Sequence, residues 1–168
     1  MRARTAVAWG LVVGWMLVIF LLSAQPGGES SSLSDSVVQV MVGALDAGAR
    51  AVGAAGVPLS IQEVLHVAVR KSAHFFAYLA LGALIAHALA TTTRITRRVG
   101  GGWQVALLAW LAATAYAATD EFHQLFVPGR AAQATDVLID SIGALLGVWL
   151  YLGVTAGSRK RVVEAAEE

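Results

Sequence analysis

Residues 137–156 read VLIDSIGALLGVWLYLGVTA, an apolar run that carries a single charge, Asp140. A helix of about 20 apolar residues is long enough to cross the hydrocarbon core of a bilayer. Three other runs of similar character cover residues 6–24, 73–91 and 103–119. Their apolar residues are continuous rather than alternating, which indicates helices and not the strands of a membrane barrel. We therefore predict an all-α, polytopic membrane protein built as a four-transmembrane-helix bundle.

The composition of the whole chain supports this interpretation. Of its 168 residues 57% are hydrophobic and only 14% are charged, and the mean hydropathy is +0.67. An ordinary soluble domain has about 25% charged residues. The composition excludes a disordered chain, which needs low hydrophobicity, and the absence of cysteine excludes a disulfide scaffold. A net charge of +1 argues against a nucleic-acid partner.

The domain organisation follows from the four runs. Residues 1–158 form one membrane domain, and residues 159–168 form a short charged cytoplasmic tail. The first run follows two arginines and resembles a signal peptide in that respect. Cleavage after Ala24 would place Leu22 at the position where the peptidase needs a small residue. We therefore expect the first helix to be retained.

Lysine and arginine set the expected orientation. With both termini in the cytoplasm, eight of these residues lie inside and four outside, which satisfies the positive-inside rule. The inner set is Arg2, Arg4, Arg94, Arg97, Arg98, Arg159, Lys160 and Arg161, and the outer set is Arg50, Arg70, Lys71 and Arg130. We expect a multi-pass protein of the bacterial plasma membrane.

The connection between the first two runs is a long outer loop over residues 25–72. It opens with a Pro-Gly-Gly turn and a serine cluster, after which residues 37–52 have apolar residues at helical spacing. This segment is expected to form an interfacial helix on the outer membrane surface. Ser60 and Glu63 form a capping box, which predicts that the next helix begins near Ile61.

Small residues at four-residue spacing predict where helices pack closely. Gly10 and Gly14 form one GxxxG pair, and Gly143 and Gly147 form another. In lipid, helix association depends on close backbone approach, which small residues permit. We interpret both pairs as packing seams, and the same seams would allow contact between two copies of the chain.

Polar and ionisable side chains gather near the outer ends of the last three runs. Helical spacing places the members from each run on one face of their helix. Charge at this depth is costly, so it is normally paired or functional. The set consists of Lys71, His74, Tyr78, Asp120, Glu121, Gln124, Arg130, Asp136 and Asp140. In the structural interpretation, Asp136 caps the last helix and Arg130 lies among headgroup phosphates.

The block at residues 120–130, DEFHQLFVPGR, resembles a signature of the VanZ-like family. The spacings Lys71-x2-His74-x3-Tyr78 and Asp136-x3-Asp140 are similar to that family as well, as is the helix exit FLLSAQP at residues 20–26. Asp140 is a mild departure, because many relatives have asparagine there. The resemblance implies a small bacterial membrane protein and, through the member that names the family, a link with low-level resistance to the glycopeptide teicoplanin. It implies no particular reaction.

The first hypothesis is that the cluster binds or modifies an anionic lipid-linked molecule of the envelope. Lys71 and Arg130 would hold a phosphate or carboxylate. His74 with Asp120 or Glu121 would act as acid and base. The remaining members of the predicted binding site are Tyr78, Gln124, Asp136 and Asp140. Both an enzyme and a binding protein fit this pattern.

Two further possibilities concern metals and non-catalytic roles. Glu121, Asp136 and Asp140 offer the oxygen ligands that Mg²⁺ prefers, and a histidine such as His74 or His123 would favour zinc, but the spacing specifies neither. Alternatively, the cluster is a polar network that locks the helices into a scaffold. A small proton- or solute-coupled transporter, assembled as an oligomer, is the last alternative, although transporter sites usually lie at the membrane midplane.

Overall fold

The computed structural model describes residues 2–92 and 102–167, and in these ranges it consists of helices without any strand. This agrees with the predicted all-α class. The five helices are α1 (Arg2–Ser23), α2 (Gly27–Ala51), α3 (Leu59–Thr91), α5 (Gly102–Gln124) and α6 (Ala134–Glu167).

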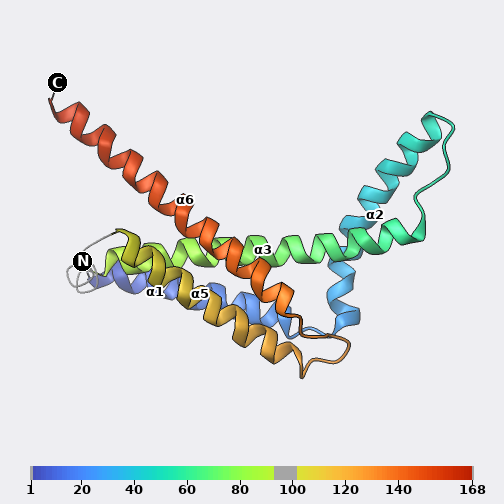
Figure 1. Ribbon diagram of the computed structural model, residues 1–168, viewed down its shortest axis with the longest axis horizontal. Coiled ribbons are helices and arrows are strands. Elements are labelled where there is room, and N and C mark those ends of the chain that lie inside the picture. Colours follow the sequence, from blue (N-terminus) through green and yellow to red (C-terminus); the bar gives the residue numbers. More distant parts are fainter. Residues whose placement is uncertain (1, 93–101, 168) are drawn as a thin grey trace.

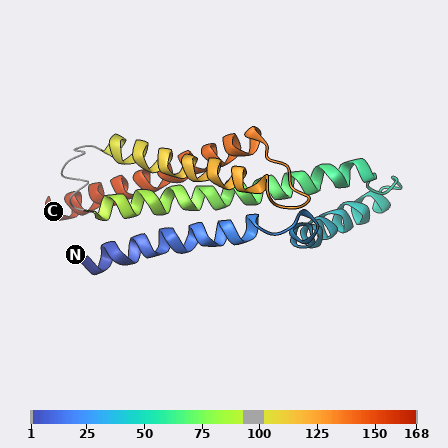
Figure 2. The same cartoon turned by 90° about the horizontal axis from the view of Figure 1, so that it is seen from below.

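Four of the helices form a bundle, and the fifth lies beyond its end. Figure 2 shows α1, α3, α5 and α6 side by side, with α3 in contact with each of the other three. In Figure 1 the N-terminal part of α3 extends past the bundle and is crossed steeply by α2. His66 of α3 and Asp35 of α2 are joined there by an ion pair of 3.3 Å between Nδ1 and Oδ1.

The closest pair in the bundle is α3 with α6. A Cβ atom added to Gly147 would overlap the carbonyl oxygen of Leu79, and one added to Gly143 would overlap that of Phe75. On the other side of the interface, Gly82 leaves no room for a side chain beside Ala144. The predicted seam at Gly143 and Gly147 is therefore confirmed as a helix contact within the chain.

The other predicted seam, at Gly10 and Gly14 of α1, is not used within the chain. An added Cβ at either glycine would have no neighbour within 4 Å. The prediction was wrong for contacts inside one molecule, because α1 turns a different face toward α3. That face carries Ala8, Val12 and Ile19, which are buried in the core.

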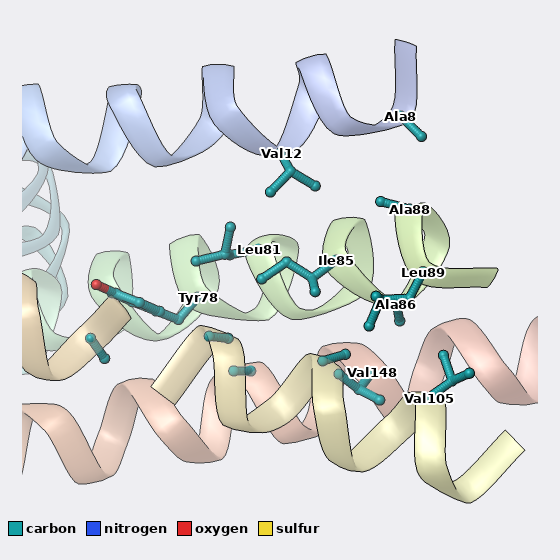
Figure 3. Packing of buried hydrophobic residues seen from close by; sticks show 14 of the residues in the cluster. Ala8, Val12, Tyr78, Leu81, Ile85, Ala86, Ala88, Leu89, Val105 and Val148 are labelled. Carbon is teal, nitrogen blue, oxygen red and sulfur yellow. The ribbon is translucent and has the colours of Figure 1, made fainter. Parts of the chain in front are cut away.

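The core between the helices is apolar and contains many small residues. Leu81 and Ile85 of α3 face Val12 of α1 and Val148 of α6 (Figure 3). A stripe of alanines at positions 109, 113 and 117 brings α5 against this surface, where all three are buried. Among the labelled side chains of Figure 3, Tyr78 alone carries a polar atom. Its hydroxyl points away from the other labelled side chains.

Three of the described helices are long and apolar enough to cross a membrane, by length and composition. They are α1, α3 and residues Ala134–Gly157 of α6. The predicted count of four is therefore not reached, since α5 is a long helix but less apolar. Gln104, Thr114 and Tyr116 interrupt its apolar sequence, and its last turns are polar. Large apolar side chains are nevertheless exposed on all the helices, an arrangement unusual for a protein surrounded by water.

Several predicted boundaries need correction. The helix predicted to begin near Ile61 begins at Leu59, with Pro58 as N-cap and no side-chain cap, so the capping box of Ser60 and Glu63 does not form. The carbonyl oxygen of Pro58 accepts bonds from the backbone N–H groups of Ile61 and Gln62 instead.

Other differences concern the loop and the chain end. The segment predicted as a turn and serine cluster is already helical, since α2 begins at Gly27. The segment predicted as a tail continues α6 to Glu167. Arg94, Arg97 and Arg98, on which the predicted orientation depends, lie outside the described residues.

Candidate functional site

Two acid–base pairs join α3 to α6 at the polar end of the bundle. Lys71 Nζ and an Asp136 carboxylate oxygen form an ion pair and hydrogen bond. One turn deeper, His74 Nδ1 lies 3.6 Å from Asp140 Oδ2. Asp136 and Asp140 are four residues apart on α6, and Lys71 and His74 are three apart on α3. Each helix therefore presents its two residues on one face, and both pairs lie in the same interface. The Asp140 side chain is buried, whereas His74 remains partly exposed.

The carboxylates of α5 have other partners. Asp120 Oδ1 accepts a hydrogen bond of 2.5 Å from Ser23 Oγ, at the end of α1. Glu121 Oε1 accepts a bond of 2.5 Å from the backbone N–H of Gln133, just before α6. Both carboxylates are buried. Hydrogen bonds of this kind tie α5 to α1 and to the α5–α6 connection.

Arg130 is directed toward the end of α1. Its Nε donates to the carbonyl of Gln25 at 2.9 Å, and a terminal guanidinium nitrogen donates to the carbonyl of Leu22 at 3.1 Å. The last carbonyls of a helix lack partners within it, and a cation there also interacts favourably with the helix dipole. Burial lowers the pKa of Arg130, as does the nearby charge of Arg70, but arginine stays protonated in proteins.

Tyr78 and Gln124 lie inside the bundle, and each has a polar atom without a hydrogen-bond partner among the described residues. Tyr78 Oη, Gln124 Nε2 and Asp140 Oδ1 are all buried, and none has a hydrogen bond with the described residues. Asp120, Asp140 and Glu121 are near enough to Tyr78 to interact with it electrostatically. These residues form a polar layer between the helices.

A small pocket opens between α3 and α6 beside the two acid–base pairs. It has room for about one water molecule. Its lining consists of Arg70, Lys71, His74, Asp136, Ile139 and Asp140. Within the described part of the chain, Arg70 has no ion-pair partner, so it is the free cation of this pocket.

The structure thus brings all nine predicted site residues to one end of the bundle, but with unequal access. Lys71, His74, Asp136 and Asp140 line the pocket, and the other five lie behind it or beside α1. In the described ranges, no group of three or more histidine and carboxylate side chains is arranged to hold a metal ion. Their roles in binding or catalysis stay predictions.

Two residues of the site were not predicted. Ser23 belongs to the helix-exit sequence, but only the fold shows that its hydroxyl meets Asp120. Arg70 was counted only for membrane orientation. Its position four residues before His74, on the same face of a helix, was a signal that could have included it.

The contacts of the polar end involve residues between Leu22 and Asp140. A family profile matches the chain over this whole range. The profile described as VanZ/LLP1 matches residues 8–155. The chain belongs to the VanZ/LLP1 family. The resemblance noted from the DEFHQLFVPGR block is therefore confirmed for this VanZ/LLP1 protein. No significant match was found among curated proteins or among solved structures.

Proposed function

We propose that this VanZ/LLP1 protein is a multi-pass protein of the bacterial plasma membrane that binds the anionic headgroup of a lipid-linked envelope molecule at its outer surface. Its effect would be on susceptibility to glycopeptides such as teicoplanin, a link that comes from the family resemblance. Residues 1–158 would form the membrane domain, with both termini in the cytoplasm.

The observation that carries the proposal is a group of cations at the pocket. Arg70 and Lys71 line it, and Arg130 lies near enough to Arg70 for the two charges to repel each other. Asp136 already pairs with Lys71, so the repulsion between Arg70 and Arg130 is what a bound anion would relieve. Arginine binds phosphate or carboxylate in a bidentate manner, and lysine adds a point charge.

The place of the cations favours an amphiphilic ligand. They lie where the apolar surface of the bundle ends, so a headgroup could reach them while its hydrocarbon stays in the membrane. Ile139 lines the pocket, and Leu138 and Ile142 are exposed nearby on α6. This combination suits a molecule with a charged head and an apolar tail.

We place α5 in the membrane with the three apolar helices. Its 23 residues correspond to about 34 Å of helix, enough to cross the hydrocarbon core. It packs against α3 and α6 along its length, and its charged residues are confined to the last two turns. Helix α2 would then lie at or above the outer surface.

Among the proposed acid–base groups, His74 is the best placed. It lines the pocket, and its Nδ1 faces Asp140 Oδ2 at 3.6 Å, so Nε2 is the ring nitrogen left for a ligand or a water molecule. Asp120 and Glu121 are buried and accept bonds from α1 and from the α5–α6 connection. Binding is therefore the primary proposal, with His74 as the group that would exchange a proton with a bound ligand.

The second candidate is a membrane scaffold in which the cluster only fixes the helices. It is favoured by the contacts of Arg130 with α1 and of Asp120 with Ser23, which join separate elements of the bundle. A network of this kind could be retained for structural specificity alone.

Arg70→Gln distinguishes the two candidates. Because Arg70 lines the pocket without an ion pair in the described part of the chain, its loss should remove anion binding and leave folding unchanged. We expect teicoplanin resistance in a sensitive host to fall at least about tenfold, the effect of 1.4 kcal/mol. The melting temperature and membrane abundance of the purified variant should equal those of the wild type.

Arg50→Gln is the matched control, since Arg50 is an exposed outer arginine of α2 away from the pocket. It should preserve resistance. Resistance that is equal in wild type, Arg70→Gln and Arg50→Gln would contradict the binding proposal and favour the scaffold, as would a wild type that confers none.

A further inference from the structure

The polar layer inside the bundle holds three buried carboxylates with few direct charge partners. The side chains of Asp120, Glu121 and Asp140 come from residues that are only 4%, 5% and 2% exposed. Such burial makes an unpaired carboxylate very unfavourable. Each of the three groups therefore needs a charge partner or a proton.

Direct ion pairing in the layer is sparse. Asp140 is paired with His74, whereas Asp120 and Glu121 have no ion pair among the described residues. Arg130 interacts with both electrostatically but forms an ion pair with neither, and Lys71 is held by a further carboxylate, Asp136. Of the other titratable groups nearby, Arg70 faces the pocket, His123 has a buried Nε2 without a hydrogen bond to the described residues, and Tyr116 donates to the carbonyl of Met16. The three buried carboxylates therefore have fewer direct charge partners than they would need if all were ionised.

Unpartnered polar atoms indicate where an additional group would be held. Tyr78 Oη can donate or accept, Gln124 Nε2 donates, and Asp140 Oδ1 accepts. All three are buried without a hydrogen bond among the described residues. A water molecule that meets two to four polar groups is the usual way in which such atoms are satisfied.

We infer that this layer is a proton-binding site: it takes up at least one proton, held on Asp140 or Asp120 beside bound water at Tyr78 and Gln124, and exchanges it with the surface through His74. No three carboxylate or histidine groups in the described residues converge as a metal site, so a proton suits the layer better than a metal ion.

The route for the proton is short and ends inside the bundle. A hydronium ion in the pocket gives a proton to His74 Nε2 and leaves a water molecule. The Nδ1 proton of the same ring passes to Asp140 Oδ2 when these two atoms, 3.6 Å apart in this structure, approach to hydrogen-bond distance. The first step breaks an O–H bond and the second an N–H bond, and neither needs another reactant. Beyond Tyr78 on α3 the core continues with Leu81 and Ile85, which offer no polar atom for a further transfer. The hydroxyl of Ser141, next to Asp140, is hydrogen-bonded to Thr114 and Trp110. The proposed role of the layer is therefore to store a proton rather than to conduct it across the membrane.

The experiment is infrared spectroscopy of the purified protein in lipid nanodiscs at neutral pH. Protonated carboxylic acids have a carbonyl stretch that carboxylates lack and that shifts in heavy water. We expect this band in the wild type. Asp140→Asn removes either the group that carries the proton or a negative charge that helps to retain it on Asp120, so it should reduce the band by at least half. Glu63→Gln, at an exposed position of α3, should leave the band unchanged.

Tyr78→Phe provides a second reading that does not alter charge. Loss of the hydroxyl should shift the position of the band without reducing its intensity, because the proton stays but its hydrogen bonding changes. A wild type without the band would overturn the inference. So would a band that is undiminished in Asp140→Asn, Asp120→Asn and Glu121→Gln alike. No lipid or antibiotic enters the measurement, so its outcome is separate from that of the proposed anion binding.

Discussion

The polar end and the apolar remainder of the same bundle are held together in different ways. At the polar end, α3 meets α6 through charged pairs such as Lys71 with Asp136. Further along the same two helices, contact is made by backbone against backbone at Gly82 and Gly147. The first contact depends on charge and hydrogen bonding, and the second on shape alone. Mutations that change only one of these properties should therefore act at only one end.

The largest effect is expected at the glycine seam. Gly147→Ala adds a single methyl group that would overlap the carbonyl oxygen of Leu79, so the two helices must separate. Overpacking against backbone cannot be relieved by a change of rotamer, and we expect a loss of about 3 kcal/mol or more. Thermal unfolding of the purified protein in detergent measures this loss.

Gly153→Ala is the matched control on the same helix, because an added Cβ there has no neighbour within 4 Å. It should unfold at nearly the wild-type temperature. If Gly147→Ala did so too, close contact would not be what holds α3 against α6.

A moderate effect is expected at the polar end. The Lys71 and Asp136 side chains are 25% and 16% exposed. Such a pair is partly screened by solvent, so Lys71→Met or Asp136→Asn alone should cost about 1–2 kcal/mol. The double variant should cost less than the sum of the two by about 1 kcal/mol, because each single change leaves the other group unpaired. Strictly additive losses would contradict the ion pair.

The smallest effect within one molecule is expected on the outer face of α1. Gly14→Ala meets no other part of the chain, so the free energy of unfolding should change by no more than about 0.5 kcal/mol. The same variant tests the proposal that this GxxxG pair joins two copies. If it does, size-exclusion chromatography in mild detergent should show a shift from dimer to monomer; a monomeric wild type would exclude that role.

The helices were largely predictable because lipid-compatible helices have an unmistakable composition. The apolar run at 137–156 lies within α6, and that at 73–91 within α3. Their outer boundaries were not predictable in the same way. Helix α3 begins at Leu59 because Pro58 serves as its N-cap, and α2 includes the serine cluster that local preference assigns to a loop. Segments beyond the apolar runs are decided by packing between α2 and α3.

The members of the site were predictable for a related reason. Lys71, His74 and Tyr78 occupy one face of a helix at any rotation of that helix, because their spacing follows the helical repeat. Their partners were not. The pairing of Lys71 with Asp136 depends on how closely α3 and α6 approach, and this approach is set by glycines elsewhere in the interface.

The sequence by itself determined the helical class, the apolar surface and the collection of ionisable residues at one end, because these follow from composition and periodicity. Only the tertiary structure decided what each polar group meets. Arg130 binds the carbonyls of α1, and Ser23 binds Asp120 across 97 positions of sequence. Tyr78 is left with a buried hydroxyl that has no partner among the described residues. The physical reason is that hydrogen bonds act over about 3 Å, and the rotation and separation of packed helices place atoms to that accuracy only once the whole bundle has assembled.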